Sequence, residues 1–364
     1  MRVLRITHSG VVTAWRARER ALLRRGVDVT VLTSTAWDEG GKTVAFTADG
    51  DDFARPVRTV GHHPNLFAFD PRPIWRMLGA GPWDLIDIHE EPCSVATAEI
   101  LALRALRRCR APFVLYSAQN IPKRYPPPFR WIERWSLGRA GGVSVCNEEA
   151  GRILKGKGLR PPATLIPLGV DTSRFAPDDR IGLAGDGPLR VGYVGRLETH
   201  KGVGVLLEAV VDEPGWTLDL IGGGPEARAL ADRARALGIG GRVRFGGFVD
   251  NDSLPERYRG LDVVVVPSVP TPGWEEQFCR VAVEAMATGV PVVVSRSGAL
   301  PEVVGDAGLL VEPGDPRSLH DALASLREVP GRWAELRRRG VARARTFTWE
   351  AVADRQLELY GSAT

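Results

Sequence analysis

Short apolar runs that do not alternate with polar residues place the strongest constraint on the fold. Two of them, residues 263–266 and 291–295, are continuous valine-rich segments in the second half of the chain. A strand that is apolar at successive positions is buried on both faces, as in a parallel sheet covered by helices on each side. Near the N-terminus, residues 3–6 and 27–32 read as strands and flank a helical pattern over residues 13–25. The sequence therefore predicts strand–helix–strand units and parallel sheets.

These units form two series. Further strands are expected at residues 85–88, 113–116, 142–145 and 164–167, and then at 189–194, 218–221 and 243–245. The stretch 178–188 between the two series is rich in Asp, Gly and Pro, which is typical of a linker. We expect an α/β protein of two doubly wound, Rossmann-like domains facing an interdomain cleft. The expected boundaries are 1–170 and 171–345, with a C-terminal helix over 346–364 that packs back on the first domain.

Composition excludes several classes of protein. The chain has 364 residues and a net charge of only +4, with no basic stripe interleaved with aromatics, so a nucleic-acid partner is not expected. Its four cysteines lie apart without a C-x-x-C pair, which indicates reduced thiols and no metal cluster. No run approaches the ~18 apolar residues of a membrane span. A cytoplasmic protein is the resulting expectation.

A loop after the 189–194 strand carries two cations. Arg196 offers a planar fork of donors and Lys201 a compact charge, and both could reach one diphosphate. Ligands of open parallel sheets bind beyond the carboxyl ends of the strands, where this loop lies. A solvated loop is the alternative. The turn around Gly223 is glycine-rich but does not spell G-x-G-x-x-G, which argues against a dinucleotide cofactor.

Two glutamates flank a predicted helix start near residues 279–280. The first amides of that helix could bind phosphate, and the helix is expected to stop before Gly289. Glu284, within the first turn or so, could accept two ribose hydroxyls, while Glu276 on the preceding loop could reach a sugar at the other end of the ligand. Alternatively, Glu284 only complements the helix dipole and Glu276 is solvated.

Together these residues resemble a family 4 retaining glycosyltransferase of the GT-B fold. The family's pair of glutamates and its surroundings are matched by Glu276, Phe278, Glu284, Ala285, Met286, Gly289, Pro291 and Val292. Its Gly-Arg…Lys-Gly loop is matched by Gly195, Arg196, Lys201 and Gly202, and its interdomain segment is similar to residues 168–171 with Phe175. The resemblance covers most of the second half and only the outline of the first.

The resemblance implies roles for the matched residues. Arg196 and Lys201 would hold the donor diphosphate, and Glu284 the ribose. Glu276 and the backbone of 277–279 would hold the transferred sugar. The implied binding residues are Gly10, Gly195, Gly223, Gln277, Phe278, Cys279, Arg280, Val281 and Glu284. Gly10 would leave room for the acceptor or a phosphate, so the first domain would be the acceptor side and the second the nucleotide-sugar side.

Two positions depart from the family pattern. Cys279 stands where the family usually has glycine, so it is strained if the position needs positive φ; otherwise its thiol narrows the sugar pocket. The family also commonly has a histidine at a strand end in the first domain. Gln119 is the best positional match, whereas His89 lies in an earlier strand-end loop, and either could line the reaction centre. His89 could instead be packed or ion-paired beside Glu90.

Three further features carry less weight. Asp49-Gly50-Asp51 spells a D-x-D metal signature but lacks its strand context, so it is interpreted as a surface turn. His62-His63 is expected in a loop, with an acceptor contact as the alternative. Residues 123–135 mix bases with aromatics and are interpreted as packing, with an acceptor lid or contact with anionic lipid headgroups as alternatives.

The expected function is metal-independent, retaining transfer of a hexose-type sugar, without a cofactor. The donor would be a nucleotide-diphosphate sugar, with UDP favoured and GDP next. The acceptor would be a hydroxyl of a small molecule or a lipid-linked saccharide, in cell-envelope glycan or secondary-metabolite biosynthesis. As the resemblance implies, the acceptor attacks on the face from which the phosphate leaves. The alternatives are a nucleotide-sugar epimerase and a non-catalytic nucleotide-sugar-binding protein. A glycosidase would leave Arg196 and Lys201 unexplained.

Overall fold

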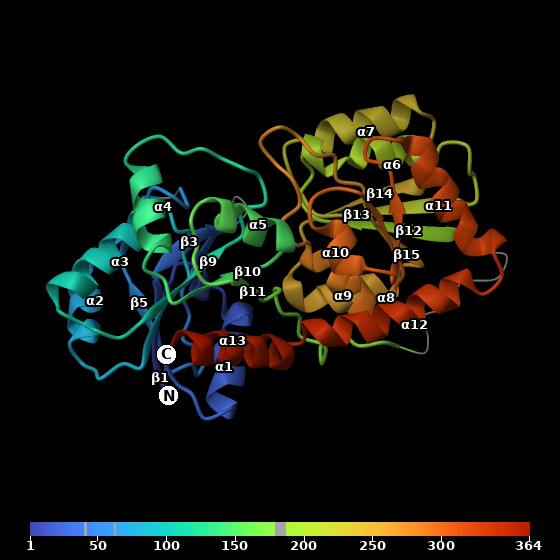
Figure 1. Cartoon of the computed structure of the whole chain (residues 1–364). Helices are drawn as coiled ribbons and strands as arrows, with labels where there is room; N and C mark the ends of the chain where they lie inside the picture. Colours follow the sequence, from blue (N-terminus) through green and yellow to red (C-terminus); the bar gives the residue numbers. More distant parts are fainter. Residues whose placement is uncertain (40–41, 62, 179–186) are drawn as a thin grey trace. The chain divides into compact units, whose positions relative to one another are not determined.

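The chain divides into two compact units, and each is described by itself. The computed structural model describes every residue except 40–41, 62 and 179–186 (Figure 1). Unit 1 comprises Met1–Gly169 and Trp349–Thr364, and unit 2 comprises Val170–Thr348. Most of the predicted linker, residues 179–186, therefore lies outside the described residues.

Unit 1 is built on a seven-stranded sheet in the order β11-β10-β9-β8-β1-β2-β5, and each neighbouring pair is parallel. Its strands are β1 (Arg2–Thr7), β2 (Asp28–Ser34), β5 (Ala54–Val57), β8 (Leu85–Ile88), β9 (Phe113–Ser117), β10 (Gly142–Val145) and β11 (Ala163–Leu165). Two short antiparallel pairs are added by β3 (Ala36–Glu39) with β4 (Lys42–Ala45), and by β6 (Thr59–Val60) with β7 (Ala68–Phe69).

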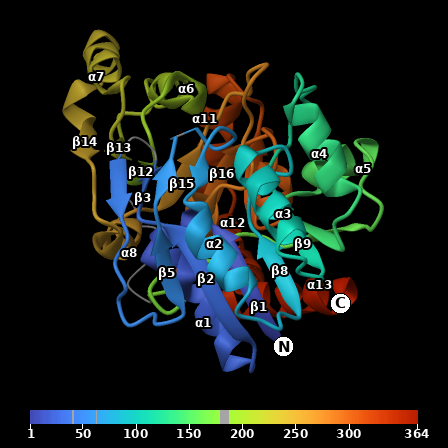
Figure 2. The same ribbon diagram turned by 90° about the vertical axis from the view of Figure 1, so that its left-hand side faces the viewer.

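Helices cover both faces of this sheet. The first face carries α2 (Pro71–Leu78), α3 (Val95–Leu106), α4 (Phe129–Leu137) and α5 (Glu148–Gly156). The second carries α1 (Ala17–Arg24) and α13 (Trp349–Ala363). In Figures 1 and 2, α2, α3 and α4 follow one another across the first face. The helix predicted over residues 13–25 begins instead as the short 3₁₀ turns η1 (Ser9–Val11) and η2 (Thr13–Arg16).

Unit 2 has a six-stranded parallel sheet in the order β14-β13-β12-β15-β16-β17. The strands are β12 (Leu189–Val194), β13 (Trp216–Ile221), β14 (Val243–Gly247), β15 (Val263–Val266), β16 (Val292–Ser295) and β17 (Gly308–Val311). Its helices are α6 (Val203–Ala209), α7 (Ala227–Ala236), α8 (Leu254–Arg259), α9 (Arg280–Thr288), α10 (Leu300–Val304), α11 (Pro316–Glu328) and α12 (Arg332–Ala344). The 3₁₀ turns are η3 (Thr199–Lys201), η4 (Gly240–Arg242), η5 (Asn251–Ser253) and η6 (Arg345–Phe347).

The predicted fold class is confirmed within each unit. All four valines of β15 are buried, as a strand covered on both faces requires. The strand order reverses direction between β12 and β15 in unit 2, and between β1 and β8 in unit 1. In open α/β sheets, ligands bind outside the carboxyl ends of the strands at such switch points. Each unit therefore has one edge position at which a site is expected.

Candidate functional site

The loops that follow β12 and β13 approach each other backbone to backbone. Gly195 has φ 148° and Gly222 has φ 136°, conformations that other residues rarely adopt. A Cβ on Gly222 would lie 1.9 Å from the carbonyl oxygen of Gly195. The Leu197 amide donates to the Gly223 carbonyl at 2.9 Å. Glycine at these positions therefore brings the loop that carries Arg196 to the switch point of unit 2.

Arg196 and Lys201 both lie on this loop and both contact carboxylates. The guanidinium of Arg196 is half-exposed and lies 2.5 Å from Glu198. The ammonium of Lys201 lies 2.6 Å from Glu276 and 4.3 Å from the centre of the Trp274 ring. Both cations are therefore oriented by carboxylates of unit 2, and the half-exposed guanidinium of Arg196 can be reached by an anionic group.

Glu276 is buried and held by three elements. Its Oε1 accepts hydrogen bonds from the Lys201 ammonium at 2.6 Å and from the Ser268 hydroxyl, just after β15, at 2.8 Å. Its carbonyl accepts the amide of Ala299 at 2.8 Å. Glu276 is only 7% exposed, and one of its oxygens bonds to both a cation and a hydroxyl. It is therefore a positioned polar group and differs from the solvated loop residue of the alternative interpretation.

The start of α9 depends on Cys279. This residue has φ 73° and ψ 81°, in the left-handed region, and forms no side-chain cap within the described part of the chain. The backbone of Cys279 is therefore strained, which is the first of the two alternatives expected from the sequence. In this conformation a residue with a Cβ costs about 1–2 kcal/mol more than glycine does. Burial also raises the pKa of the Cys279 thiol to about 12. At the other end, Gly289 has φ 84° and ends the helix.

Glu284 lies close to the position expected from the sequence. The helix begins at Arg280, so Glu284 is in the second turn, behind the first amides. One of its oxygens accepts the Tyr258 hydroxyl at 2.9 Å. Burial raises the pKa of Glu284, while Arg280 and the Tyr258 hydrogen bond partly oppose that rise.

The other expected binding positions of unit 2 differ in exposure. Phe278 is buried and its ring packs edge-on against Phe347 at 5.6 Å, so its side chain belongs to the core. Gln277 is exposed, and Arg280 and Val281 are half-buried. These residues join Glu276 to α9 in one continuous segment, beside the loop of Arg196.

The switch point of unit 1 brings together the turns after β1 and β8. The amide of His8 donates to Glu90 at 2.6 Å, and the His8 ring nitrogen Nδ1 lies 2.7 Å from the same carboxylate. The His8 ring also packs against Trp37 at 4.3 Å. Gly10 is buried, and a Cβ there would lie 3.0 Å from the Thr33 hydroxyl. Gly10 therefore allows close packing of the β1 turn against β2.

His89 and Gln119 both lie beyond strand ends in this unit, but their surroundings differ. The His89 ring stacks on Tyr116 at 3.9 Å, and its Nδ1 is buried without a hydrogen-bond partner among the described residues. Burial lowers the pKa of His89 well below its usual value, with a smaller effect from Arg5, so the ring is neutral near pH 7. The Gln119 amide instead donates to Ile121 and accepts from Tyr125 within its own loop.

Two of the minor sequence features lie elsewhere in unit 1. Asp49 accepts from two threonine hydroxyls, and buried Asp51 pairs with Arg16 and Arg20, so this D-x-D is used within the protein. Among the described residues, no group of His, Cys, Asp and Glu is arranged to hold a metal ion. His63 is exposed, and His62 is outside the described residues. Nor does any helix in the described chain have the length and apolar character needed to cross a bilayer.

Sequence reasoning did not find every residue of these edges. Ser268 and Tyr258 contact the two glutamates of unit 2, and Glu90 holds His8 in unit 1. The position of Ser268 at the end of a buried strand was a usable signal. No sequence signal pointed to Tyr258, because it contacts Glu284 from a separate helix.

Comparisons with known proteins identify the family of the chain. The model "Glycosyl transferases group 1" matches residues 177–347, and "Glycosyltransferase Family 4" matches residues 8–174. The chain belongs to the family 4 glycosyltransferases. It is 35% identical over 240 residues to D-inositol 3-phosphate glycosyltransferase 2 of Catenulispora acidiphila, which is 60% of this chain and 55% of that protein. A Rhodococcus jostii D-inositol 3-phosphate glycosyltransferase is also 35% identical, over 61% of this chain and 52% of that protein. The matches thus span about half the length of these relatives.

Solved structures support the fold of this family 4 member. Anabaena Alr3699/HepE, in complex with UDP, superposes with a TM-score of 0.78 at 21% identity, and each chain is covered completely. Sucrose-phosphate synthase of Thermosynechococcus elongatus gives a TM-score of 0.70 at 22% identity, over 99% of this chain and 98% of that one. At these identities the likeness concerns the fold alone.

Proposed function

We propose that the protein is a retaining glycosyltransferase that takes a hexose-type sugar from a nucleotide-diphosphate sugar and transfers it to a hydroxyl. The observation that carries this proposal is the network of Lys201, Glu276 and Ser268 at the switch point of unit 2. It puts a cation and a buried carboxylate beside the loop of Arg196 and the start of α9. A diphosphate needs a cation, and a sugar hydroxyl needs an acceptor such as a carboxylate.

The proposed mechanism works by positioning and charge stabilisation. Arg196, Lys201 and the first amides of α9 would stabilise the diphosphate as it leaves, without a metal ion. Glu284 would accept ribose hydroxyls and Glu276 hydroxyls of the transferred sugar. As the C1–O bond to the phosphate breaks, the acceptor oxygen bonds to the same face of C1, and a phosphate oxygen takes the acceptor's proton. The acceptor would be bound by unit 1.

Ligand binding gives the first test. Thermal unfolding would be followed with UDP, GDP, ADP, TDP and NAD, for the wild type and for Arg196→Ala. A ligand at about 100 times its dissociation constant adds about 2.7 kcal/mol of stability. We expect a shift with one nucleoside diphosphate, UDP first and GDP next, that the variant loses. A shift with NAD alone, or with none of them, contradicts the proposal.

Turnover tests the second half of the proposal. The relatives' names make D-inositol 3-phosphate the first acceptor to try, followed by neutral sugars and lipid-linked saccharides. NMR of the product should show that the anomeric configuration of the donor is retained. An isomerised donor without acceptor would indicate an epimerase. Tight nucleotide binding without turnover in any acceptor mixture would indicate a non-catalytic protein.

A further inference from the structure

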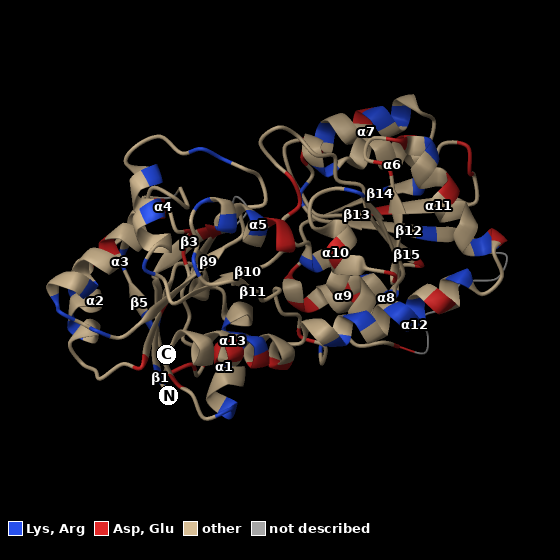
Figure 3. Cartoon of the chain, in the orientation of Figure 1, with Lys and Arg blue, Asp and Glu red and all other residues tan. Residues whose placement is uncertain are grey.

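The surface formed by α2 and the C-terminal half of α3 in unit 1 is rich in arginine. The acids nearest to it in sequence, Asp70 and Glu99, accept backbone amides. The segments 71–81 and 102–112 contain six arginines and no Asp or Glu. Five of these arginines are exposed, namely Arg72, Arg76, Arg107, Arg108 and Arg110. None of the five has a carboxylate within 4.0 Å in the described part of the chain, and we call them the α2–α3 arginines. In Figure 3, the ribbon of α2 is coloured blue where it carries arginine.

On the opposite face of the same unit, the arginines form ion pairs. Each of the arginines on α1 and directly flanking it pairs with a carboxylate: Arg16 and Arg20 with Asp51, Arg18 with Glu19, Arg24 with Glu350, and Arg25 with Asp354. An arginine-rich composition alone would affect both faces equally. The α2–α3 surface is therefore a local concentration of uncompensated charge.

Helix stability does not explain this charge either. Cations are favourable near the C-terminus of a helix, which accounts in part for Arg107 after α3. Arg72, however, lies in the first turn of α2, where the helix dipole disfavours a cation. An external anionic partner would stabilise all of these positions.

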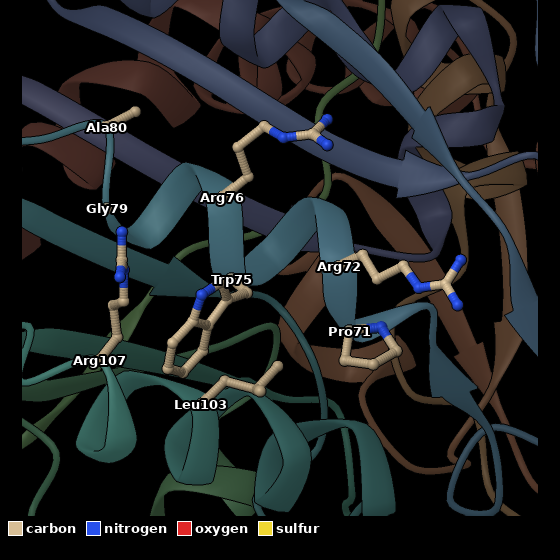
Figure 4. A pocket seen from close by; sticks show the side chains of 8 residues that line it. All are labelled: Pro71, Arg72, Trp75, Arg76, Gly79, Ala80, Leu103 and Arg107. Atoms are coloured by element: carbon tan, nitrogen blue, oxygen red, sulfur yellow. The ribbon is translucent and has the colours of Figure 1, made fainter.

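Apolar side chains are exposed on the same surface. Trp75 lies in an open groove of about 790 Å³ between α2 and α3, with Leu103 and Arg107 beside it (Figure 4). The Arg107 guanidinium lies 5.0 Å from the Trp75 ring centre. Leu106 at the end of α3 is 71% exposed. On the neighbouring helix α4, which packs against α3, Trp131 is 62% exposed between Arg130 and Arg134.

We propose that the α2–α3 surface, continued by the exposed face of α4, docks the protein on a membrane whose lipids carry anionic phosphate headgroups. Arginine forks match phosphate oxygens, and tryptophan and leucine enter the headgroup region of a bilayer. Exposed Leu106 and the two tryptophans favour a bilayer over a nucleic acid, which would leave Leu106 in water. This proposal does not depend on the catalytic one.

Vesicle co-sedimentation of the full chain tests it. Vesicles of phosphatidylcholine alone would be compared with vesicles that also contain phosphatidylglycerol. We expect binding only to the anionic vesicles at low salt, and its loss in about 1 M salt, where the Debye length is about 3 Å. Binding to neither kind of vesicle, or equal binding to both, overturns the proposal.

Matched charge variants locate the surface. The triple variant R72Q/R76Q/R107Q should lower the partition coefficient on anionic vesicles at least about tenfold. The control R160Q/R228Q/R317Q removes the same net charge from exposed arginines elsewhere and should change it by less than about twofold. Equal losses in the two variants would contradict the assignment. If the triple variant does not fold, the single variant Arg76→Gln should still weaken binding about fivefold.

Two competitors separate the sources of phosphate. Inorganic phosphate should displace the protein from vesicles no better than chloride of equal ionic strength. Stronger displacement by phosphate would indicate a discrete small-anion site instead of a membrane surface. Binding to a single-stranded RNA as tight as to the vesicles, and lost in the same triple variant, would likewise overturn the membrane assignment.

Discussion

The carboxyl edges of the two sheets use different electrostatics. At the edge of unit 2, charged groups face each other in short ion pairs, such as Lys201 with Glu276 and Arg196 with Glu198. At the edge of unit 1, beside the His8–Glu90 pair, burial shifts two groups after β8 toward their neutral forms: it lowers the pKa of His89 and raises that of Glu91. Burial also raises the pKa of Glu284 in unit 2, but there Arg280 opposes the rise. Fixed charges suit an anionic diphosphate, whereas neutral polar groups in a less polar setting suit an uncharged hydroxyl. The contrast supports a donor role for unit 2 and an acceptor role for unit 1.

Lys201→Ala tests the charged edge and should have the largest effect. It removes a cation from the diphosphate site, together with the ion pair between that ammonium and buried Glu276. We expect kcat/KM for the donor to fall about 10²- to 10³-fold, together with a lower Tm. Lys155→Ala, which removes an exposed lysine on α5, is the control.

A second variant separates binding from stability at this position. Lys201→Ala combined with Glu276→Gln should recover much of the lost Tm, because the buried negative charge is removed together with the ammonium that balances it. It should not recover activity. Full activity in either variant would show that the ion pair is only structural.

His89→Ala tests the neutral edge, with Gln119→Ala as its comparison. His89 presents a buried ring nitrogen without a partner in the described chain, whereas the Gln119 side chain is occupied within its own loop. We expect kcat to fall about 10²-fold for His89→Ala and only severalfold for Gln119→Ala, with little change in UDP binding for either. The reverse order would assign the reaction centre to Gln119.

The same histidine makes stability depend on pH. Its pKa is lowered in the folded protein, so below about pH 6.5 the unfolded chain takes up a proton that the folded chain does not. Stability should therefore fall as the pH decreases through that range. His89→Ala should weaken this dependence in Tm measured from pH 7.5 to 5.5; an unchanged slope would contradict it.

The contrast between the edges also explains what the sequence could reveal. In unit 2, Arg196, Lys201, Glu276 and Glu284 lie on two short segments, each of which follows a single strand. Local pattern was therefore enough to propose them as site residues. In unit 1, the difference between His89 and Gln119 lies in side-chain contacts: His89 stacks on Tyr116 of the neighbouring strand, and Gln119 bonds to Tyr125 within its own loop. The parallel sheets could be predicted from the sequence, because a strand that is buried on both faces appears as a continuous apolar run.

Tyr258 is a residue of unit 2 whose contact local sequence pattern could not predict. It lies on α8, yet its hydroxyl bonds to Glu284 on α9, and such a contact depends on helix packing. Likewise, only the observed backbone shows that Cys279 adopts positive φ. Residues that act by supporting others are the ones that local sequence pattern cannot identify.

Tyr258→Phe tests whether the charged edge needs this support. Without the hydroxyl, Glu284 loses a hydrogen bond that favours its charged form, so its pKa, already raised by burial, should rise further. We expect UDP to bind about 3- to 10-fold more weakly. Binding should also be lost at a higher pH than in the wild type, as the carboxylate protonates on acidification.

Two ligands make this result specific. Discrimination between UDP and its 2′,3′-dideoxy analogue should decrease in Tyr258→Phe, because Glu284 would bind the ribose hydroxyls less well. Pyrophosphate, which has no ribose, should bind the variant as it binds the wild type. Equal weakening for all three ligands would mean that Tyr258 supports only the fold.

Cys279→Gly should have the smallest effect, and it acts on stability. Glycine adopts φ 73° without steric cost, so the variant should gain about 1 kcal/mol, or about 2–4 °C in Tm for a unit of this size. Cys279→Ala removes the thiol but keeps the strained backbone, and it should gain nothing. If both variants are stabilised equally, the buried thiol and not the backbone is the source of strain. If Cys279→Gly instead destabilises unit 2 while UDP binding is retained, packing of the cysteine side chain outweighs the strain at the start of α9.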